Sequence, residues 1–220
     1  MSEPYRDLGI NIRTLLPSNK GAAILDFGCG SGRLIGYLVE NGYENITGVD
    51  RQISGCDSAS TAGARLLQIE SAQTYLASQK ACFDPIFVKD VLYYFDAEEI
   101  VPIARQLREA LKPGGTAVFE IFNGSVLTGP YVKYKDLGIK LILTEHSLQN
   151  VLEEAGWTVQ RMHGNKPVLR SSMSYLFAAA GVLWRGLLRL VYLVERGVDS
   201  ENPRILTKKV IAVATNEQQT

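Results

Sequence analysis

The chain has 220 residues, and its 46% hydrophobic content is enough to bury a sizeable core. Its 23 basic and 23 acidic residues cancel, so no overall field attracts nucleic acid or an anionic membrane. The three cysteines, Cys29, Cys56 and Cys82, form no C-x-x-C pair, which excludes a disulfide framework and predicts no metal site. The first 20 residues carry charges and no apolar run, so we expect no signal peptide and a cytoplasmic protein.

The predicted elements alternate between short apolar strands and helices. Residues 1–20 predict a leading amphipathic helix that ends at Pro17. After it come, in chain order, a strand over 22–27, a helix over 33–40, strands over 46–50, 66–69 and 83–88, a helix over 98–111, a strand over 116–122, a helix over 147–154, and strands over 157–162 and 209–214. Continuous apolar strands of this length are typical of a parallel sheet that helices cover on both faces.

No repeat or low-complexity tract divides the chain, so we expect one α/β domain over residues 1–220. Two segments interrupt the alternation of strands and helices. We expect the first, 123–144, to be an irregular insertion on the substrate side of the sheet. The second, 164–206, holds a long apolar helix before the last strand.

A glycine-rich turn, Gly28-Cys29-Gly30-Ser31-Gly32, follows the first strand and opens a helix. Glycines at this place let the chain turn sharply and let a ligand approach the main chain closely. A P-loop would continue with Lys-Ser or Lys-Thr, but Arg33 comes next, which argues against that site. The dinucleotide fingerprint would have glycine where Arg33 stands.

Asp26, two residues before the first glycine, distinguishes the remaining ligand classes. Its carboxylate would repel a pyrophosphate but suits a cation such as an α-ammonium group. S-adenosylmethionine (SAM) carries such a group, with a sulfonium and no phosphate. Asp50, at the end of the second strand, stands where a carboxylate accepts hydrogen bonds from both ribose hydroxyls, as it also does in NAD-binding folds.

Four motifs together resemble those of the class I (Rossmann-like) SAM-dependent methyltransferases. They are Leu25 to Gly32, Gly48 to Asp50, Phe83 to Leu92, and Leu111 to Gly115, and they follow the family order across residues 20–160. The resemblance implies a doubly wound, seven-stranded, mostly parallel sheet whose last strand is antiparallel. It also implies SAM as cofactor and S-adenosylhomocysteine as product.

The resemblance further implies a role for each residue of the cofactor site. Asp26 would bind the methionine ammonium, Asp50 would hold the ribose, and Asp90 would line the methionine end and the entrance for substrate. An acidic or polar side chain after the third strand would face the adenine amino group, and Glu70 and Ser71 are equal alternatives for it. The remaining residues of the implied set are Gly28, Cys29, Gly30 and Gly32, beneath the methionine and ribose, and Arg51, beside the adenine.

For the acceptor side, Tyr93 and Tyr94 replace the acidic–histidine pair that is usual after the fourth strand. Two tyrosines there either stack against a substrate ring or pack in the core. The 123–144 segment is aromatic and charged, which favours a substrate wall that includes Asn123, Tyr131 and Tyr134.

The C-terminal half also resembles a bacterial methyltransferase subgroup associated with glycan or polysaccharide biosynthesis. The similarity rests on Tyr134-x-Asp136-Leu137, Thr144-x-x-Ser147-Leu148, Ala155-Gly156-Trp157 and Leu206-Thr207. In that subgroup a histidine commonly follows the Asp-Leu pair by two positions, where this chain has Ile139. Asp136 and His146 are therefore the candidates for base chemistry, although a histidine also serves structural roles.

The apolar helix over residues 171–196 has no charge before Arg185. Arg185, Arg189 and Arg196 share one helical face, and they interrupt the roughly 20 consecutive apolar residues that a bilayer span requires. Three interpretations remain: a lid over the site, a homodimer interface, or a helix lying on a membrane face. The last would suit a lipid-linked sugar and a protein peripheral to the inner membrane face.

Two functions follow from these features. The first is a SAM-dependent methyltransferase that modifies an oxygen or nitrogen of a small-molecule or glycan-linked acceptor. The second is a SAM-binding, non-catalytic relative that acts as a regulatory partner of another protein. No basic stripe with interleaved aromatics occurs, so a nucleic-acid acceptor is not expected.

Overall fold

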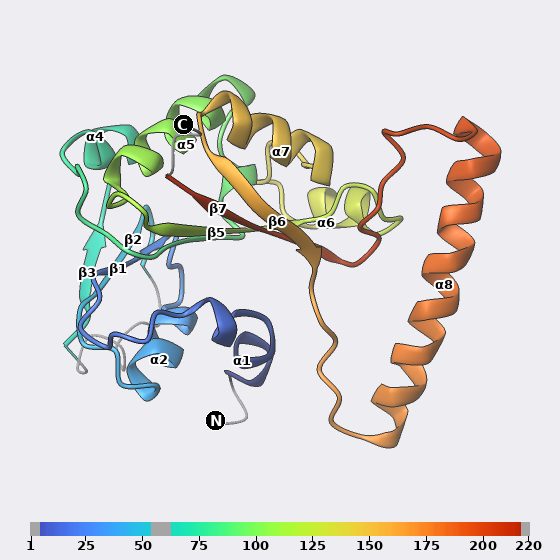
Figure 1. Ribbon diagram of the computed structural model, residues 1–220, viewed down its shortest axis with the longest axis horizontal. Helices are drawn as coiled ribbons and strands as arrows, with labels where there is room; N and C mark the ends of the chain where they lie inside the picture. The colour runs from blue at the N-terminus through green and yellow to red at the C-terminus, as the bar shows by residue number, and fades with distance from the viewer. Residues whose placement is uncertain (1–4, 54–62, 217–220) are drawn as a thin grey trace.

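The computed structural model describes residues 5–53 and 63–216, and Cys56 lies outside them (Figure 1). The first half comprises α1 (Arg6–Ile12), η2 (Arg13–Leu15), β1 (Ile24–Phe27), α2 (Arg33–Glu40), β2 (Ile46–Asp50), β3 (Arg65–Gln68), α4 (Ala72–Ala77), β4 (Ile86–Lys89) and η3 (Leu92–Tyr94). The second half comprises α5 (Ala97–Ala110), β5 (Thr116–Phe122), α6 (Gly129–Lys135), α7 (Glu145–Glu154), β6 (Thr158–Gly164), α8 (Ser172–Arg196) and β7 (Lys209–Thr215).

The strands form one seven-stranded sheet in the order β3-β2-β1-β4-β5-β7-β6. β1 to β5 pair in parallel, and β7 runs antiparallel to both β5 and β6. The chain order reverses at β1, from which it winds outward in both directions, so the predicted doubly wound fold with an antiparallel last strand is confirmed. In such a sheet ligands bind at the carboxyl ends of the strands, next to the reversal.

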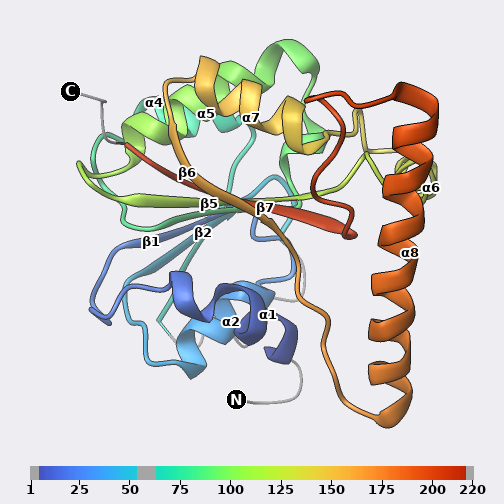
Figure 2. The same ribbon diagram turned by 45° about the vertical axis from the view of Figure 1, so that its right-hand side comes forward.

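Two hydrophobic layers enclose the sheet, as its apolar strands require. On one face α4, α5 and α7 pack through residues such as Leu76, Leu107 and Leu148. On the other face α1 and α2 pack through Ile12 and Ile35. Figure 2 shows these layers on opposite sides of the sheet. All four residues of β1 are buried, because both layers rest on this central strand.

Local sequence explains where several helices begin. Asp96 and Glu99 form a capping box that starts α5, and the Thr144 hydroxyl accepts a hydrogen bond from the Ser147 amide at the start of α7. The cap sets the start of α7 at Glu145, two residues earlier than the apolar spacing predicted. Helix α4 was missed altogether, because its six residues are too few to show a helical period.

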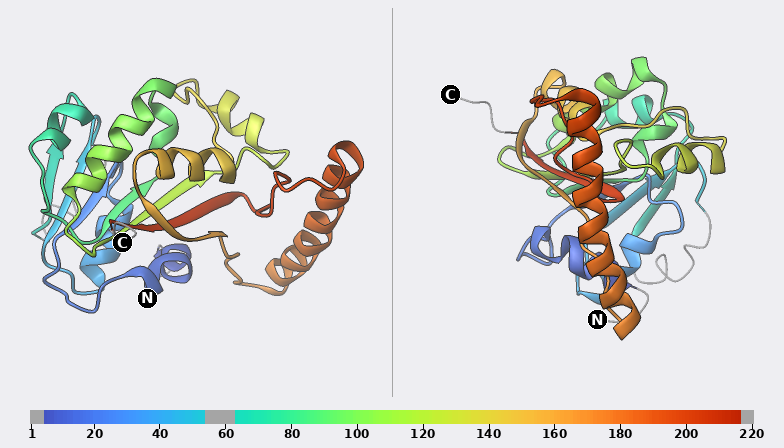
Figure 3. Two further views of the ribbon diagram at one scale, coloured as in Figure 1. Left: turned by 45° about the horizontal axis from the view of Figure 1, so that its top comes forward. Right: turned by 90° about the vertical axis from the view of Figure 1, so that its right-hand side faces the viewer.

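The two segments predicted as insertions differ in structure. The 123–144 segment is not irregular throughout, because it contains α6 with Pro130 in its first turn. The 164–206 segment contains α8, which continues through its arginines for 25 residues and connects β6 to β7. Figure 3 shows α8 beyond the edge of the sheet, apart from both helical layers.

Candidate active site

The glycine turn, residues 28–32, lies at the carboxyl end of β1. The amides of Gly28 and Cys29 both donate to the Val49 carbonyl, over 2.8 and 3.0 Å. Gly28 has a φ of 82°, and a Cβ there would lie 2.5 Å from the side chain of Val91. Gly30 has a φ of 52°, but no atom lies within 4 Å of the Cβ that it would carry. Gly28 is therefore required by the fold, whereas Gly30 leaves open space for a ligand.

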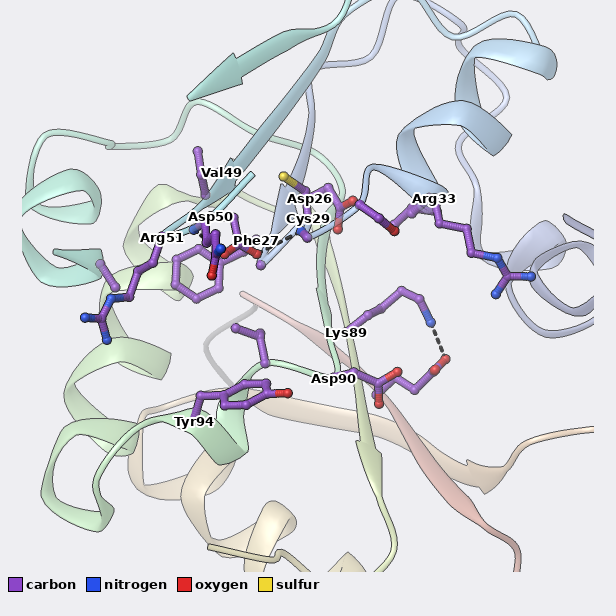
Figure 4. A pocket seen from close by; sticks show the side chains of 18 of the residues that line it. Asp26, Phe27, Cys29, Arg33, Val49, Asp50, Arg51, Lys89, Asp90 and Tyr94 are labelled. Atoms are coloured by element: carbon purple, nitrogen blue, oxygen red, sulfur yellow. Dashed lines mark hydrogen bonds and ion pairs between the residues drawn. The ribbon is translucent and has the colours of Figure 1, made fainter. Parts of the chain in front are cut away.

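A cavity of about 780 Å³ opens beside this turn and lies within the usual size range of small-molecule sites. Its wall comes from the ends of β1, β2 and β4, the start of β7, and the glycine turn. We call it the main cavity. Figure 4 shows the side chains that face it; the charged ones labelled there are Asp26, Arg33, Asp50, Arg51, Lys89 and Asp90.

Asp26 lies in the wall of the main cavity and is 2% exposed. Burial raises the pKa of Asp26 to about 7, against the opposing effect of Lys89 and with a further rise from Asp50. Among the described residues, no donor forms a hydrogen bond with its carboxylate. A buried carboxylate without a donor of its own is suited to a cationic ligand group.

Asp50 ends β2 with both carboxylate oxygens oriented by main-chain amides. The Gly30 amide donates to Oδ2 over 2.8 Å, and the Gln52 amide donates to Oδ1 over 3.0 Å. Each oxygen keeps a second lone pair that can accept from a ligand hydroxyl. Asp50 therefore joins the glycine turn to the next strand and still presents a bidentate acceptor to the main cavity.

Beyond Asp50 the wall of the main cavity includes Ile69 and Ala72. Between them in the sequence lie Glu70 and Ser71, the two alternatives predicted to contact the adenine. The Ser71 hydroxyl caps α4 by accepting from the Thr74 amide. Glu70 lies in a smaller adjoining hollow, which shares Ile69 with the main cavity. Of the two alternatives, Glu70 is the one left free to meet a ligand.

Four charged side chains from three adjacent strands form a cluster in the wall of the main cavity. Lys89 on β4 pairs with Glu120 on β5, and Lys209 on β7 pairs with both Glu120 and Asp90. Burial by itself would raise the pKa of Glu120, but Lys89 and Lys209 outweigh it and lower that pKa. Burial opposes the charge of Lys209, but Asp90 and Glu120 hold its pKa above the usual value. Pairing therefore favours the charged forms of Glu120 and Lys209.

Asp90 follows β4 with a φ of 55°, a left-handed conformation that aspartate and asparagine tolerate better than most residues. Burial raises the pKa of Asp90, and Lys209 only partly offsets this. Its Oδ1 atom is buried without a hydrogen-bond partner among the described residues. The Tyr93 hydroxyl lies against this carboxylate, and burial and the charge of Asp90 raise the pKa of Tyr93. Tyr93 therefore supports Asp90 and is not itself part of the cavity wall.

Tyr94 lies at the rim of the main cavity, where its hydroxyl donates to Asp136 over 2.7 Å. Burial, then the hydrogen bond to Asp136, raises the pKa of Tyr94 to about 12. The same bond and a second one from the Gly138 amide lower the pKa of Asp136. Asp136 therefore meets the site only through Tyr94, and its lowered pKa makes it a weak base.

Three predicted substrate contacts lie away from the main cavity. Asn123 is fully buried, and its amide donates to the carbonyls of Ile205 and Thr207 over 2.7 and 3.0 Å. It holds a loop in place, since polar side chains that are buried must find partners inside the protein. Tyr131 and Tyr134 lie on α6, 67% and 76% exposed.

Two further predictions are corrected in the same way. His146 does not reach the main cavity. Its Nε2 atom lies 3.9 Å from Oε1 of Glu145. The Glu145 carboxylate accepts hydrogen bonds from the amides of Arg204 and Ile205. Gly32 serves as the N-cap of α2 and does not line the cavity either. Histidine chemistry from His146 is therefore not available to a ligand in the cavity.

The residues predicted from the sequence did not include Lys89, Glu120 and Lys209, although a signal was present. Glu120 interrupts the otherwise apolar run of β5 near its carboxyl end. A charge inside a strand that is buried on both faces is costly unless it is paired, so it marks a site. Lys89 ends β4 and Lys209 begins β7, the two strands that flank β5, and only the strand order reveals that both lie beside Glu120.

The comparisons with known proteins agree with this geometry. The profile of a family described as "Methyltransferase domain" matches residues 4–161. The chain belongs to the methyltransferase domain family. A search of the curated proteins found no match.

Solved methyltransferases share the fold at low identity. A SAM-dependent methyltransferase of Archaeoglobus fulgidus is 19% identical, covers 92% of this chain and 90% of its own, and has a TM-score of 0.64. The 1,6-didemethyltoxoflavin-N1-methyltransferase of Burkholderia thailandensis, solved with S-adenosylhomocysteine, is 15% identical. It covers 96% of this chain and 76% of its own, and it has a TM-score of 0.61. A methyltransferase bound to the Haloferax volcanii Trm112 activator is 14% identical. It covers 97% of this chain and 94% of its own, and it has a TM-score of 0.64.

The residues of the main cavity fit SAM, the cofactor of this methyltransferase. The buried carboxylate of Asp26 lacks a donor and suits the ammonium group, and Asp50 presents two oxygens for the ribose hydroxyls. Gly30 leaves the space that close approach to the main chain requires. Arg51 also lines the cavity, and its place beside the adenine stays a prediction.

Proposed function

We propose that this methyltransferase acts on an oxygen or nitrogen of a small-molecule or glycan-linked acceptor, with Asp90 as the proton acceptor. Bound SAM supplies a methyl group on a positively charged sulfur. The chain then has to hold the acceptor in line and remove the proton of a neutral hydroxyl or amine. The observation that carries this proposal is Asp90 in the cavity wall, because burial raises its pKa and makes it a stronger base than an ordinary aspartate.

The surrounding side chains support that role. Lys209 pairs with Asp90, and Tyr93 lies behind it, so the carboxylate is held in one orientation. Tyr94 lies at the rim beside it and donates to Asp136, which does not line the cavity. The raised pKa of Tyr94 and the lowered pKa of Asp136 make both poor bases. We assign Tyr94, and not Asp136, to the wall that receives the acceptor.

Two observations bear on the class of acceptor. The Burkholderia neighbour, by its name, methylates a nitrogen of a small heterocycle. The motifs at 134–137 and 144–148 resemble the glycan-biosynthesis subgroup, but Tyr134 is exposed and does not line the main cavity, and the motif histidine is replaced by Ile139. A small acceptor therefore fits better than a glycan that reaches the cavity across α6.

The test is S-adenosylhomocysteine release from SAM with phenols and heteroaromatic amines in one arm and nucleotide sugars in the other. Asp90→Asn keeps a residue that accepts the left-handed conformation but removes the base. We expect kcat to fall by about 10² to 10⁴, with little change in SAM affinity. In the unaltered protein kcat should rise with pH through the pKa of Asp90, since only the ionised carboxylate accepts a proton.

Asp136→Asn is the matched control, because it makes the same change in a carboxylate that does not line the main cavity. We expect it to keep kcat within a few-fold of the unaltered protein. A wild-type rate in Asp90→Asn would show that Asp90 is not the base. SAM binding without turnover in any arm would favour the alternative, a non-catalytic relative that acts with a partner protein, as one structural neighbour is bound to an activator.

A further inference from the structure

Helix α8 is the one long element of the described chain that the fold leaves almost uncovered (Figure 3). Only Leu188 is buried along its 25 residues. The Tyr192 hydroxyl tethers the helix to the body by donating to the Ser125 carbonyl over 2.9 Å. Large apolar side chains elsewhere on α8 are open to solvent, among them Leu183 at 78% and Val194 at 77%. A soluble protein rarely exposes so continuous an apolar surface without a partner for it.

The apolar side chains of α8 occupy more than half of its circumference. At 100° per residue, exposed apolar positions run without a charge from Val182 through Leu190 and Leu187 to Trp184, a sector of about 200°. The three arginines of α8 fall within a sector of about 40°, which lies between the uncharged sector and Leu188. They are Arg185, Arg189 and Arg196. We call the uncharged sector the apolar face of α8.

Length and composition alone would let α8 cross a bilayer. The sheet rules this out, because α8 connects β6 to β7 and these strands pair directly, Gly164 with Val210. A single crossing would leave its two ends on opposite sides of the membrane, about 30 Å apart, while both lead into neighbouring strands of one sheet. The residues between them, 165–208, are all described and hold no second helix that could return the chain. A membrane can therefore meet α8 only along its side.

The width of the apolar face decides between a lipid surface and a second copy of the chain. A helix that packs on another helix buries a stripe of roughly 100°. Such contact would leave about half of the apolar face in water, whereas a bilayer surface covers all of it. The charge points the same way: residues 164–200 contain five basic and two acidic side chains. Trp184 and Tyr175 on the apolar face are residue types that favour the membrane–water interface.

We propose that α8 is an in-plane anchor that docks this protein on anionic membrane surfaces. The apolar face enters the boundary between headgroups and acyl chains. The arginines on its flank stay at headgroup level, where lipid phosphates pair with them. Arg185 makes no hydrogen bond or ion pair with any described residue and is the cation most available to a phosphate. This docking is independent of the acceptor and of methyl transfer.

The test uses the full chain with vesicles of phosphatidylcholine alone or mixed in equal parts with phosphatidylglycerol. We expect flotation with the mixed vesicles, weaker flotation with phosphatidylcholine, and loss of binding as salt increases. The tryptophans add a local readout, since Trp157 is buried against Ala104 and Trp184 is 47% exposed. A blue shift of emission on mixing therefore reports Trp184 entering lipid.

Leu183→Glu with Leu190→Glu places two charges on the apolar face and should weaken vesicle binding at least tenfold. Leu127→Glu with Leu137→Glu is the matched control, because it makes the same two changes at residues that are 69% and 91% exposed and lie outside α8. SAM affinity and circular dichroism show that each variant is folded. Equal vesicle binding by the double variant and its control would overturn the proposal.

Two further outcomes would also overturn it. One is no flotation of the unaltered protein with mixed vesicles at low salt. The other is an absence of vesicle binding together with a dimer, seen by light scattering, that the double variant converts to monomers. That result would assign the apolar face to a contact between two copies of the chain.

Discussion

At the scale of single residues, Asp26 shows how a binding role and a stability cost arise from the same burial. Its carboxylate is 2% exposed, faces the main cavity, and has no donor among the described residues. The fold therefore disfavours its ionised form, and the pKa of Asp26 lies at about 7 instead of 3.8. A cationic ligand group reverses this, because it stabilises the ionised form that burial destabilises.

The first prediction concerns the pH dependence of unfolding in Asp26→Asn. Between pH 3.8 and 7 the folded chain holds a proton on Asp26 that the unfolded chain has lost, so stability falls as pH rises through this window. The loss is complete above pH 7 and amounts to at most about 4 kcal/mol. Asp26→Asn should therefore be more stable than the unaltered protein at pH 8 and similar to it at pH 4.

Urea unfolding of both proteins across that range measures the effect. Asp136→Asn serves as the control, since Asp136 is exposed and has a lowered pKa. A stability difference between Asp26→Asn and the unaltered protein that does not change with pH would mean that Asp26 ionises normally in the fold. The same variant should bind SAM more weakly at pH 8, because an amide offers no charge to the ammonium group.

At the scale of elements, the β1–turn–α2 unit was predictable because its signals are local. An apolar strand, three glycines and an amphipathic helix follow each other within 17 residues. Helix α4 escaped prediction because six residues show no period, and Ser71 gave only a cap signal that was interpreted as a ligand contact. Tyr131 and Tyr134 were assigned to a substrate wall from composition, and the formation of α6 turned them outward.

The second prediction separates the two glycines of this unit. Gly28→Ala puts a Cβ 2.5 Å from Val91 at a φ of 82°, so it should lower both stability and SAM affinity. Gly30→Ala meets no protein atom within 4 Å. It should cost only about 1 kcal/mol of stability for its left-handed backbone but still weaken SAM binding, because the methyl group occupies ligand space.

Thermal unfolding and calorimetric titration with S-adenosylhomocysteine distinguish the two effects. The result to expect is a large fall in Tm for Gly28→Ala only, and a loss of affinity for both variants. An undiminished affinity in Gly30→Ala would show that the ligand does not approach the turn closely. Gly42→Ala, which also has a positive φ and an open Cβ position but lies outside the main cavity, controls for backbone strain alone.

At the scale of the whole molecule, strand order decides which distant residues meet. The sequence predicted seven strands and several functional residues at their ends, but it did not predict that β7 lies between β5 and β6. That insertion brings Lys209 beside Glu120 and Asp90, which lie 89 and 119 positions away in the chain. It also fixes both ends of α8 to one edge of the sheet, so a helix with the composition of a membrane span lies along the molecule.

The last prediction concerns the connector 197–208, which links α8 to β7 and so to Lys209 in the main cavity. Glu145 on α7 is buried and accepts from the amides of Arg204 and Ile205, and hydrogen bonds to a charged group contribute about 1.5–3 kcal/mol each. Glu145→Gln loses one acceptor and the charge. We therefore expect the amides of Arg204 and Ile205 to exchange with solvent deuterium at least tenfold faster, while those of β7 stay protected.

Gln149→Ala is the control for this measurement, because the Gln149 side chain is exposed on α7. Among the described residues it forms a side-chain hydrogen bond only with Glu153. Unchanged exchange at Arg204 and Ile205 in Glu145→Gln would show that other contacts hold the connector. Faster exchange together with unchanged SAM affinity would show that Glu145 fixes the position of α8 without shaping the cofactor site. The connector would then be an attachment between α8 and α7 that is separate from the cofactor site.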